Sequence, residues 1–225
     1  MKSHRNSGAP AWAWILWGLV GVGSILIAPH LPARVATHFG ASGLPNEYRS
    51  RWVLALTQPA IMLVILLGWE GLWRIDPRRE NYAAMGSTYR FVGGLVIGFL
   101  ALVQSFLLLH GLGWLSWNAS RLFGALLGLL LALSANVLPR VQPNWWLGIR
   151  TPWTLSSEAV WRRTHHIGGQ TGVLTGLIVI ATSLTLPTSW VTTTTVGLIL
   201  LWATTMAVAS YWFFAHPGPG PSPPP

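Results

Sequence analysis

The chain has no cysteine, which excludes a disulfide framework, a thiolate metal site and a cysteine nucleophile. Acidic residues are scarce as well: 5 Asp and Glu stand against 14 Lys and Arg in 225 residues, so the formal net charge is +9. Charged residues make up only 8% of the chain, whereas a soluble domain carries about 25%. So few charges cannot cover the surface of a soluble enzyme of this length.

In place of charge, the chain has long apolar runs. Hydrophobic residues make up 52% of it, which excludes intrinsic disorder. A membrane-spanning helix needs about 20 mostly apolar residues. Six stretches approach or reach this length without Lys, Arg or Asp and with Glu70 as their only acid: 11–29, 52–73, 91–112, 122–138, 167–187 and 191–214. No Ala-x-Ala site follows the first, so we interpret it as a retained span and not as a signal peptide. The sequence therefore predicts an all-α, polytopic integral membrane protein with six transmembrane helices in one membrane domain.

The basic residues lie mostly at the ends of these spans. Ten fall on the side of the two termini and four on the other. Since basic residues favour the cytoplasm, both termini are predicted to be cytoplasmic, with 30–51 an external loop and 139–166 a cytoplasmic one. No direct contact with nucleic acid is expected, because the basic residues lie mostly at the ends of the spans, where they determine topology. The Pro-rich tail, 216–225, is predicted to be disordered.

Both long loops fall between the first and second spans of a three-span half, so they face opposite sides. This arrangement is typical of an inverted repeat, and we treat a 3+3 repeat as a hypothesis. The letters Leu-Pro-Ala-Arg-Val at 31–35 and Leu-Pro-Arg-Val at 138–141 echo one another. Superposition of the two halves of a structure tests the hypothesis.

The cytoplasmic loop contains four tryptophans within 145–161, which indicates a segment lying on the membrane surface. Its prolines and Gly148 predict extended or turn structure over 139–153, and Thr154 is the expected N-cap of a helix leading into the fifth span. The pair Glu158 and Arg162 has helical i,i+4 spacing, which is typical of an interfacial ion pair.

The alternative interpretation of this loop is a polar site in which Asn144, Arg150, Glu158 and His165 converge on an anionic or peptidic ligand. Adjacent histidines on a helix diverge by about 100°, so His165 and its neighbour are not expected to share a metal ion. We expect no metal and no cofactor. No catalytic residue is assigned, because no nucleophile has an evident activating base.

Polar and small residues inside the spans are expected to hold helices together. Gln104 lies near the middle of the third span, where an amide joins neighbouring helices. Glycines recur at four-residue spacing, which lets helices approach closely: Gly94 and Gly98; Gly124 and Gly128; Gly168, Gly172 and Gly176. In the external loop, 37–46 is rich in turn residues, and ordinary turn chemistry with a solvated His38 is the simplest interpretation.

The stretch 143–165 reads Pro-Asn-Trp-Trp-Leu-Gly-Ile-Arg-Thr-Pro-Trp-Thr-Leu-Ser-Ser-Glu-Ala-Val-Trp-Arg-Arg-Thr-His. It resembles the signature of the SdpI/YfhL family of bacterial multi-pass membrane proteins. A looser similarity covers 38–43, with Gly40 where the family commonly has Asn. The resemblance implies a set of binding or signalling residues: Pro143, Asn144, Gly148, Arg150, Thr151, Pro152, Trp153, Thr154, Glu158, Trp161, Thr164 and His165 in the cytoplasmic loop, with His38 and Gly43 in the external one.

The resemblance also implies a function. Well-understood members of the family confer immunity against a secreted, membrane-active toxin peptide and hold a cytoplasmic repressor at the membrane. The partners implied are the lipid bilayer of the bacterial cytoplasmic membrane, a toxin peptide and a repressor, with the oligomeric state left open. Two alternatives stay open: a small-molecule or lipid transporter or flippase, and a membrane enzyme with a polar site at the cytoplasmic face.

Overall fold

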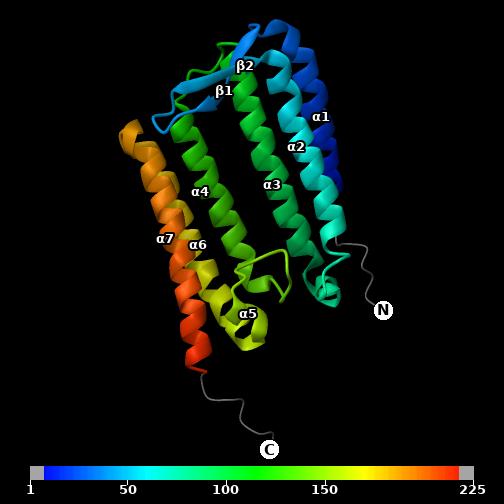
Figure 1. Cartoon of the computed structure of the whole chain (residues 1–225), viewed down its shortest axis with the longest axis vertical. Helices are drawn as coiled ribbons and strands as arrows, with labels where there is room; N and C mark the ends of the chain where they lie inside the picture. The colour runs from blue at the N-terminus through cyan, green and yellow to red at the C-terminus, as the bar shows by residue number, and fades with distance from the viewer. Residues whose placement is uncertain (1–7, 218–225) are drawn as a thin grey trace, which may run out of the picture.

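The computed structural model describes residues 8–217. Six long helices dominate this part of the chain (Figure 1): α1 (Ala11–Ile27), α2 (Arg51–Leu72), α3 (Tyr82–Gly111), α4 (Ala119–Val137), α6 (Glu158–Thr185) and α7 (Thr188–Ala215). All six are long and apolar enough to cross a membrane, as a six-span protein requires. Most of the tail predicted to be disordered, 218–225, lies outside the described residues.

The six helices form two groups of three. Within the first group, α1, α2 and α3 all contact one another, and within the second, α4, α6 and α7 do the same. The two groups meet along α3 and α4 (Figure 1). Each group therefore contains three consecutive spans.

The closest helix packing is the contact of α4 with α6, and glycine makes it close. A β-carbon placed on Gly128 would lie 2.7 Å from the carbonyl oxygen of Gly176, and one placed on Gly172 would lie 2.7 Å from the β-carbon of Ala135. Larger side chains would force the backbones apart. The expectation that these glycines form a helix-packing seam is confirmed for this pair of helices.

Gln104 also joins helices. Its fully buried amide nitrogen donates to the hydroxyl of Ser24 on α1 at 2.9 Å and to the carbonyl of Leu54 on α2 at 3.2 Å. The expected role in holding helices together is confirmed, and it connects all three helices of the first group.

The expectation that the chain is wholly α-helical is wrong at one end of the bundle. Strands β1 (Arg34–Phe39) and β2 (Pro45–Ser50) form an antiparallel hairpin where ordinary turns were expected. A two-stranded hairpin is marginal by itself. Here Val35 is buried in a cluster with Phe106 of α3, and Phe39 packs on Phe106 and Phe123. Tertiary packing therefore stabilises strands that local turn chemistry does not predict.

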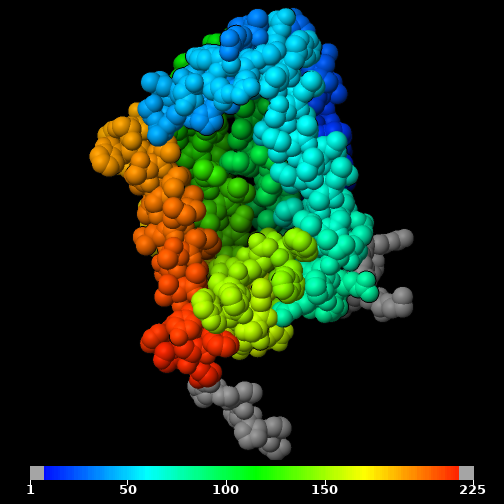
Figure 2. Space-filling view, viewed as in Figure 1, coloured from blue at the N-terminus to red at the C-terminus, as the bar shows by residue number. Residues whose placement is uncertain are grey.

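Each long connection contacts the other group of helices. The turn of the hairpin accepts two hydrogen bonds from the second group: Asn118 Nδ2 donates to the carbonyl of Ser42 at 2.8 Å, and Thr192 Oγ1 to that of Ala41 at 2.7 Å. At the other end, the connection between α4 and α6 packs on the first group. Between these two ends Figure 2 shows a hollow that separates α2 from α7 and has α3 and α4 at its floor.

The proposed inverted repeat stays a prediction, but the chain leaves the first helix of each group in the same way. A one-turn 3-10 helix follows α1 at Ala28–His30 and follows α4 at Leu138–Arg140, each with proline at its second position. Judged by its place after the first helix of each group, segment 138–140 corresponds to 28–30. The sequence similarity had instead paired it with 31–35.

Candidate functional site: the signature loop and the hairpin

Residues 141–157, here called the signature loop, fold around the side chain of Asn144. This amide is fully buried. Its oxygen accepts from the backbone N–H groups of Trp146 at 2.8 Å and Leu147 at 2.6 Å, and its nitrogen donates to the carbonyls of Gln142 and Leu147. Because these partners belong to the loop, Asn144 shapes the loop. Its oxygen also accepts from the hydroxyl of Tyr82 on α3 at 3.5 Å, so the amide has little capacity left for a ligand.

A carboxylate outside the predicted set holds the signature loop on the first group of helices. Asp76, in the connection between α2 and α3, is 3% exposed. Its Oδ2 accepts from the hydroxyl of Tyr82 and from the backbone N–H of Trp145, both at 2.9 Å, and its Oδ1 accepts from the N–H of Arg78 at 2.8 Å. Three donors compensate the burial of the charge.

Two further hydrogen bonds strengthen this junction. Arg78 donates from Nη2 to the carbonyl of Leu155 at 2.7 Å, and Asn81 donates from Nδ2 to the carbonyl of Pro143 at 2.7 Å. Sequence reasoning missed all of these residues. The sequence did contain a feature that could have drawn attention to Asp76. It is the only aspartate of the chain, and the Asp-Pro pair it forms favours a turn.

His165 supports the loop from α6 and is 1% exposed. Its Nε2 accepts from the backbone N–H of Ile149 at 3.0 Å, and its Nδ1 lies 2.9 Å from the carbonyl of Trp161. This pairing assigns the neutral tautomer with the proton on Nδ1. Gly148 lies over the ring with φ of 106°, and a β-carbon there would collide with Nε2.

The second half of the loop contains the short helix α5 (Pro152–Ser156). Its N-cap is Thr151, and Thr154 completes a capping box within α5. The expectation that Thr154 caps the helix entering the fifth span is therefore wrong, because Ser157 caps α6 by accepting from the N–H of Val160. A helix also begins at Pro152, where extended structure was expected, since proline suits a first helical position.

The remaining signature residues join the loop to helices. Thr151 exchanges a 2.8 Å hydrogen bond with Ser210 of α7, and the ring of Trp153 packs on Tyr211 with centroids 5.1 Å apart. Trp161 is buried and donates to the carbonyl of Val141 at 2.8 Å. Thr164 is fully buried, and its hydroxyl has no partner among the described residues.

The proposed convergence of four polar side chains does not occur in this structure. Asn144 and His165 are buried within the loop, whereas Glu158 pairs with Arg162 at 3.8 Å, with both side chains more than half exposed. The i,i+4 ion pair is thus the arrangement observed. Arg150 is exposed and donates to the carbonyl of Trp145 at 2.6 Å. Near it, Trp145 is 48% exposed.

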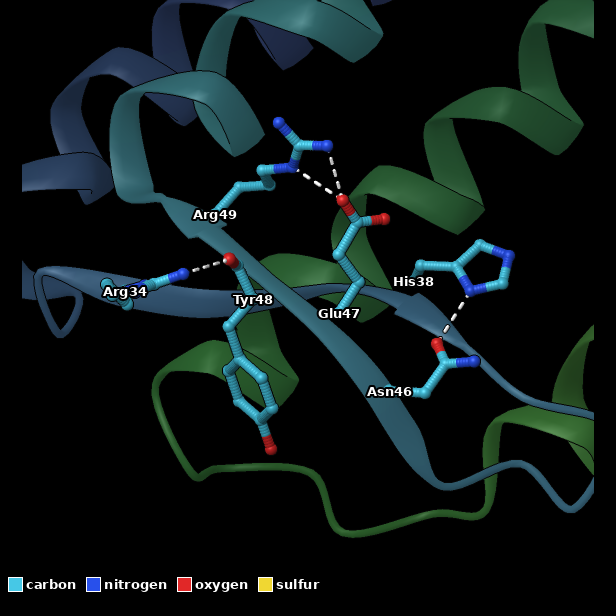
Figure 3. Close-up of polar contacts among 6 residues, drawn as sticks. All are labelled: Arg34, His38, Asn46, Glu47, Tyr48 and Arg49. Atoms are coloured by element: carbon cyan, nitrogen blue, oxygen red, sulfur yellow. Dashed lines mark hydrogen bonds and ion pairs between the residues drawn. The ribbon is translucent and has the colours of Figure 1, made fainter.

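At the opposite end, His38 and Gly43 occupy different parts of the hairpin. Figure 3 shows the imidazole of His38 facing Asn46 across the strands, with Nδ1 2.6 Å from Oδ1, and the neighbouring pair of Glu47 with Arg49. Gly43 forms the turn with φ of 76°, a conformation that favours glycine, and a β-carbon there would collide with Asn118.

A pocket of about 420 Å³ lies beneath the hairpin. The hairpin contributes His38, Phe39 and Asn46, and the walls are formed by α4 and α7, including Phe123 and Thr195. The hairpin and the helices each contribute both polar and apolar side chains to its lining. Among residues 8–217, no group of three or more His, Asp or Glu side chains could hold a metal ion.

Comparisons with known proteins agree with this architecture. The family model described as the SdpI/YfhL protein family matches residues 140–216, which include the whole signature loop, α6 and α7. A second, described as Domain of unknown function (DUF1648), matches residues 15–63, which include the hairpin. The immunity protein SdpI of Bacillus subtilis (strain 168) is 25% identical over 191 residues, covering 85% of this chain and 88% of that protein. No solved structure gives a significant match. Together, the family-model match and the curated relative show that this multi-pass membrane protein belongs to the SdpI/YfhL family.

Proposed function

We propose that this protein confers immunity against a membrane-active toxin peptide in the bacterial cytoplasmic membrane, and that it transmits toxin contact to a cytoplasmic regulator. The observation that carries the proposal is the similarity to a protein named for immunity, which extends over 85% of the chain. The excess of basic residues at the signature-loop end supports a cytoplasmic position for that end and an external one for the hairpin.

In this proposal the toxin meets the hairpin end. The pocket beneath the hairpin is lined by apolar side chains, including Phe123, and by polar ones, including His38 and Asn46. An amphipathic peptide segment entering from the bilayer could contact both kinds of side chain there. Because the hairpin turn is bonded to α4 and α7, a peptide that displaces the hairpin also changes the contact between the two groups of helices.

The regulator would meet the exposed part of the signature loop. Arg150 and the tryptophans at 145 and 146 are accessible there, whereas most other signature residues are committed to folding the loop. Arginine and tryptophan are the side chains most often found at the centre of protein interfaces. The charge of Arg150 suits an acidic surface on the partner.

Neither alternative function gains an observation in its favour. A transporter needs a polar path near the middle of the membrane, and Gln104, the expected candidate, is fully buried with its amide nitrogen committed to Ser24 and Leu54. A membrane enzyme needs Glu158 or His165 in a cleft with a second reactive group, but one is exposed in an ion pair and the other buried under Gly148.

The test is a survival assay. The chain is expressed in a bacterium that lacks its own immunity protein, and the cells are challenged with a membrane-active toxin peptide from a producing strain. We expect survival to increase when the chain is present in the membrane at wild-type levels. Unchanged survival against that peptide, with the protein inserted in the membrane at the same level, would refute the proposal.

Sidedness is tested separately on the same chain. Because the protein has no cysteine, single substitutions give clean labelling sites. Ser42→Cys in the hairpin turn should react with a membrane-impermeant maleimide in intact cells, and Ser156→Cys in the signature loop should react only after the cells are opened. The reverse pattern would exclude the proposed orientation.

A further inference from the structure

A basic pocket lies beside the signature loop and takes no part in folding it. It has a volume of about 400 Å³ and is lined by Pro139 together with Arg162, Arg163, His166 and Ile167. The two arginines and the histidine come from one face of α6, since positions three and four apart are neighbours on a helix. Arg140, which follows Pro139, is exposed and adds positive charge beside this pocket.

Neighbouring aromatic residues indicate where this pocket lies relative to the membrane surface. The guanidinium of Arg163 lies over the ring of Phe213 on α7, 4.5 Å from its centroid. Phe213 belongs to a run of four aromatic residues, of which three have large exposed fractions: Tyr211 53%, Trp212 59% and Phe214 47%. Exposed aromatic side chains at the end of a membrane helix mark the level of the lipid headgroups. The pocket therefore lies at headgroup level.

The two sides of the pocket differ in chemistry. The arginines and His166 lie near the N-terminal end of α6, and Ile167 begins the apolar part of the same helix. A ligand seated here has its anionic group against the guanidiniums and its apolar part along the helix. The geometry points to a binding site for an anionic phospholipid, whose phosphate lies between Arg162 and Arg163 and whose acyl chains follow α6 into the bilayer.

Within the described residues, one acid faces this cluster. Glu158 pairs with Arg162 at 3.8 Å, and both side chains are more than half exposed, so the pair is weak and screened. A phosphate that binds two guanidinium groups competes well with Glu158 for Arg162. Removing the charge of Glu158 should therefore strengthen lipid binding.

The experiment is native mass spectrometry of the full chain in detergent, titrated with phosphatidylglycerol, cardiolipin and phosphatidylcholine. We expect both anionic lipids to bind more tightly than phosphatidylcholine. The double variant Arg162→Gln/Arg163→Gln should weaken their binding by about 25-fold, about fivefold for each guanidinium. Arg79→Gln removes one exposed charge at the same end of the molecule but outside the pocket, and should leave binding unchanged.

Glu158→Gln should bind the anionic lipids more tightly than the wild-type chain, a gain that misfolding cannot produce. A parallel titration with inorganic phosphate separates a lipid site from a site for free phosphate. The inference is overturned if phosphate displaces the lipids at equal concentration, if the double variant binds as the wild type does, or if Arg79→Gln weakens binding as much as the double variant.

Discussion

Asp76 is the residue whose loss should most clearly separate the signature loop from the rest of the protein. Its buried carboxylate accepts from Tyr82, Trp145 and Arg78, and it joins the α2–α3 connection to the loop. In Asp76→Asn, one acceptor oxygen is replaced by an NH₂ group that faces donors. Two buried donors then lose a charged acceptor, at about 1.5–3 kcal/mol each. We expect local destabilisation of about 3–6 kcal/mol.

The assay is hydrogen–deuterium exchange of the amides in 143–149, in detergent or nanodiscs. The N–H groups of Trp145, Trp146 and Leu147 are bonded to Asp76 or Asn144, so they exchange only when the loop opens. A local cost of about 3 kcal/mol predicts exchange about a hundredfold faster, since about 1.4 kcal/mol is a factor of ten.

Glu80→Gln is the matched control, because Glu80 is an exposed acid in the same connection. It should leave exchange over 143–149 unchanged. The variant Tyr82→Phe removes one donor to Asp76, so it should cost less in the Asp76→Asn background than in the wild type. Equal exchange in Asp76→Asn and Glu80→Gln would show that this carboxylate does not hold the loop.

Three further predictions concern positions with little room or with paired hydrogen bonds. Gly148→Ala forces a side chain into the left-handed region and against a histidine ring, so the melting temperature in detergent should fall clearly and exchange in the signature loop should rise. Gly128→Ala should weaken the α4–α6 contact and lower the melting temperature. Gly98→Ala, where a β-carbon has no neighbour within 4 Å, should leave the melting temperature nearly unchanged. Equal effects of the two variants would contradict a glycine seam between α4 and α6. Asn118→Ala should destabilise by about 1–2 kcal/mol, because the residue caps α4 and binds the hairpin, whereas Thr192→Val should cost about 1 kcal/mol. In both variants the hairpin amides should exchange faster than in the wild type. Unchanged exchange would show that these hydrogen bonds do not hold the hairpin on α4 and α7.

Much of the fold could be predicted from the sequence because the membrane imposes simple demands. Apolar runs of sufficient length predict spanning helices, and the glycine spacing in 124–128 and 168–176 predicted the seam that α4 and α6 form. The same local reasoning found the ion pair of Glu158 with Arg162, since residues four apart on a helix are neighbours. These features depend on residues close together in the chain or on length alone.

The candidate site was identified by its motif, but the motif did not reveal what each residue does. Asn144 and His165 were expected to join a polar site, and the structure commits them to hydrogen bonds with the backbone of the loop. Arg150 lies at the surface, as a recognition residue requires. A motif shows which residues belong together but not whether each faces inward or outward.

The sequence by itself indicated that the protein spans a membrane, that it has six spans and which family it resembles. The length of the apolar runs and an unbroken signature are properties of the chain alone. The tertiary structure decided which polar groups meet. Asp76 reaches Trp145 across 69 residues, and Thr192 reaches Ala41 across 151. No periodicity records such pairs, because they form only when separate helices pack and each buried donor must find an acceptor. Hydrogen bonds to the opposite group of helices therefore hold the hairpin and the signature loop in place.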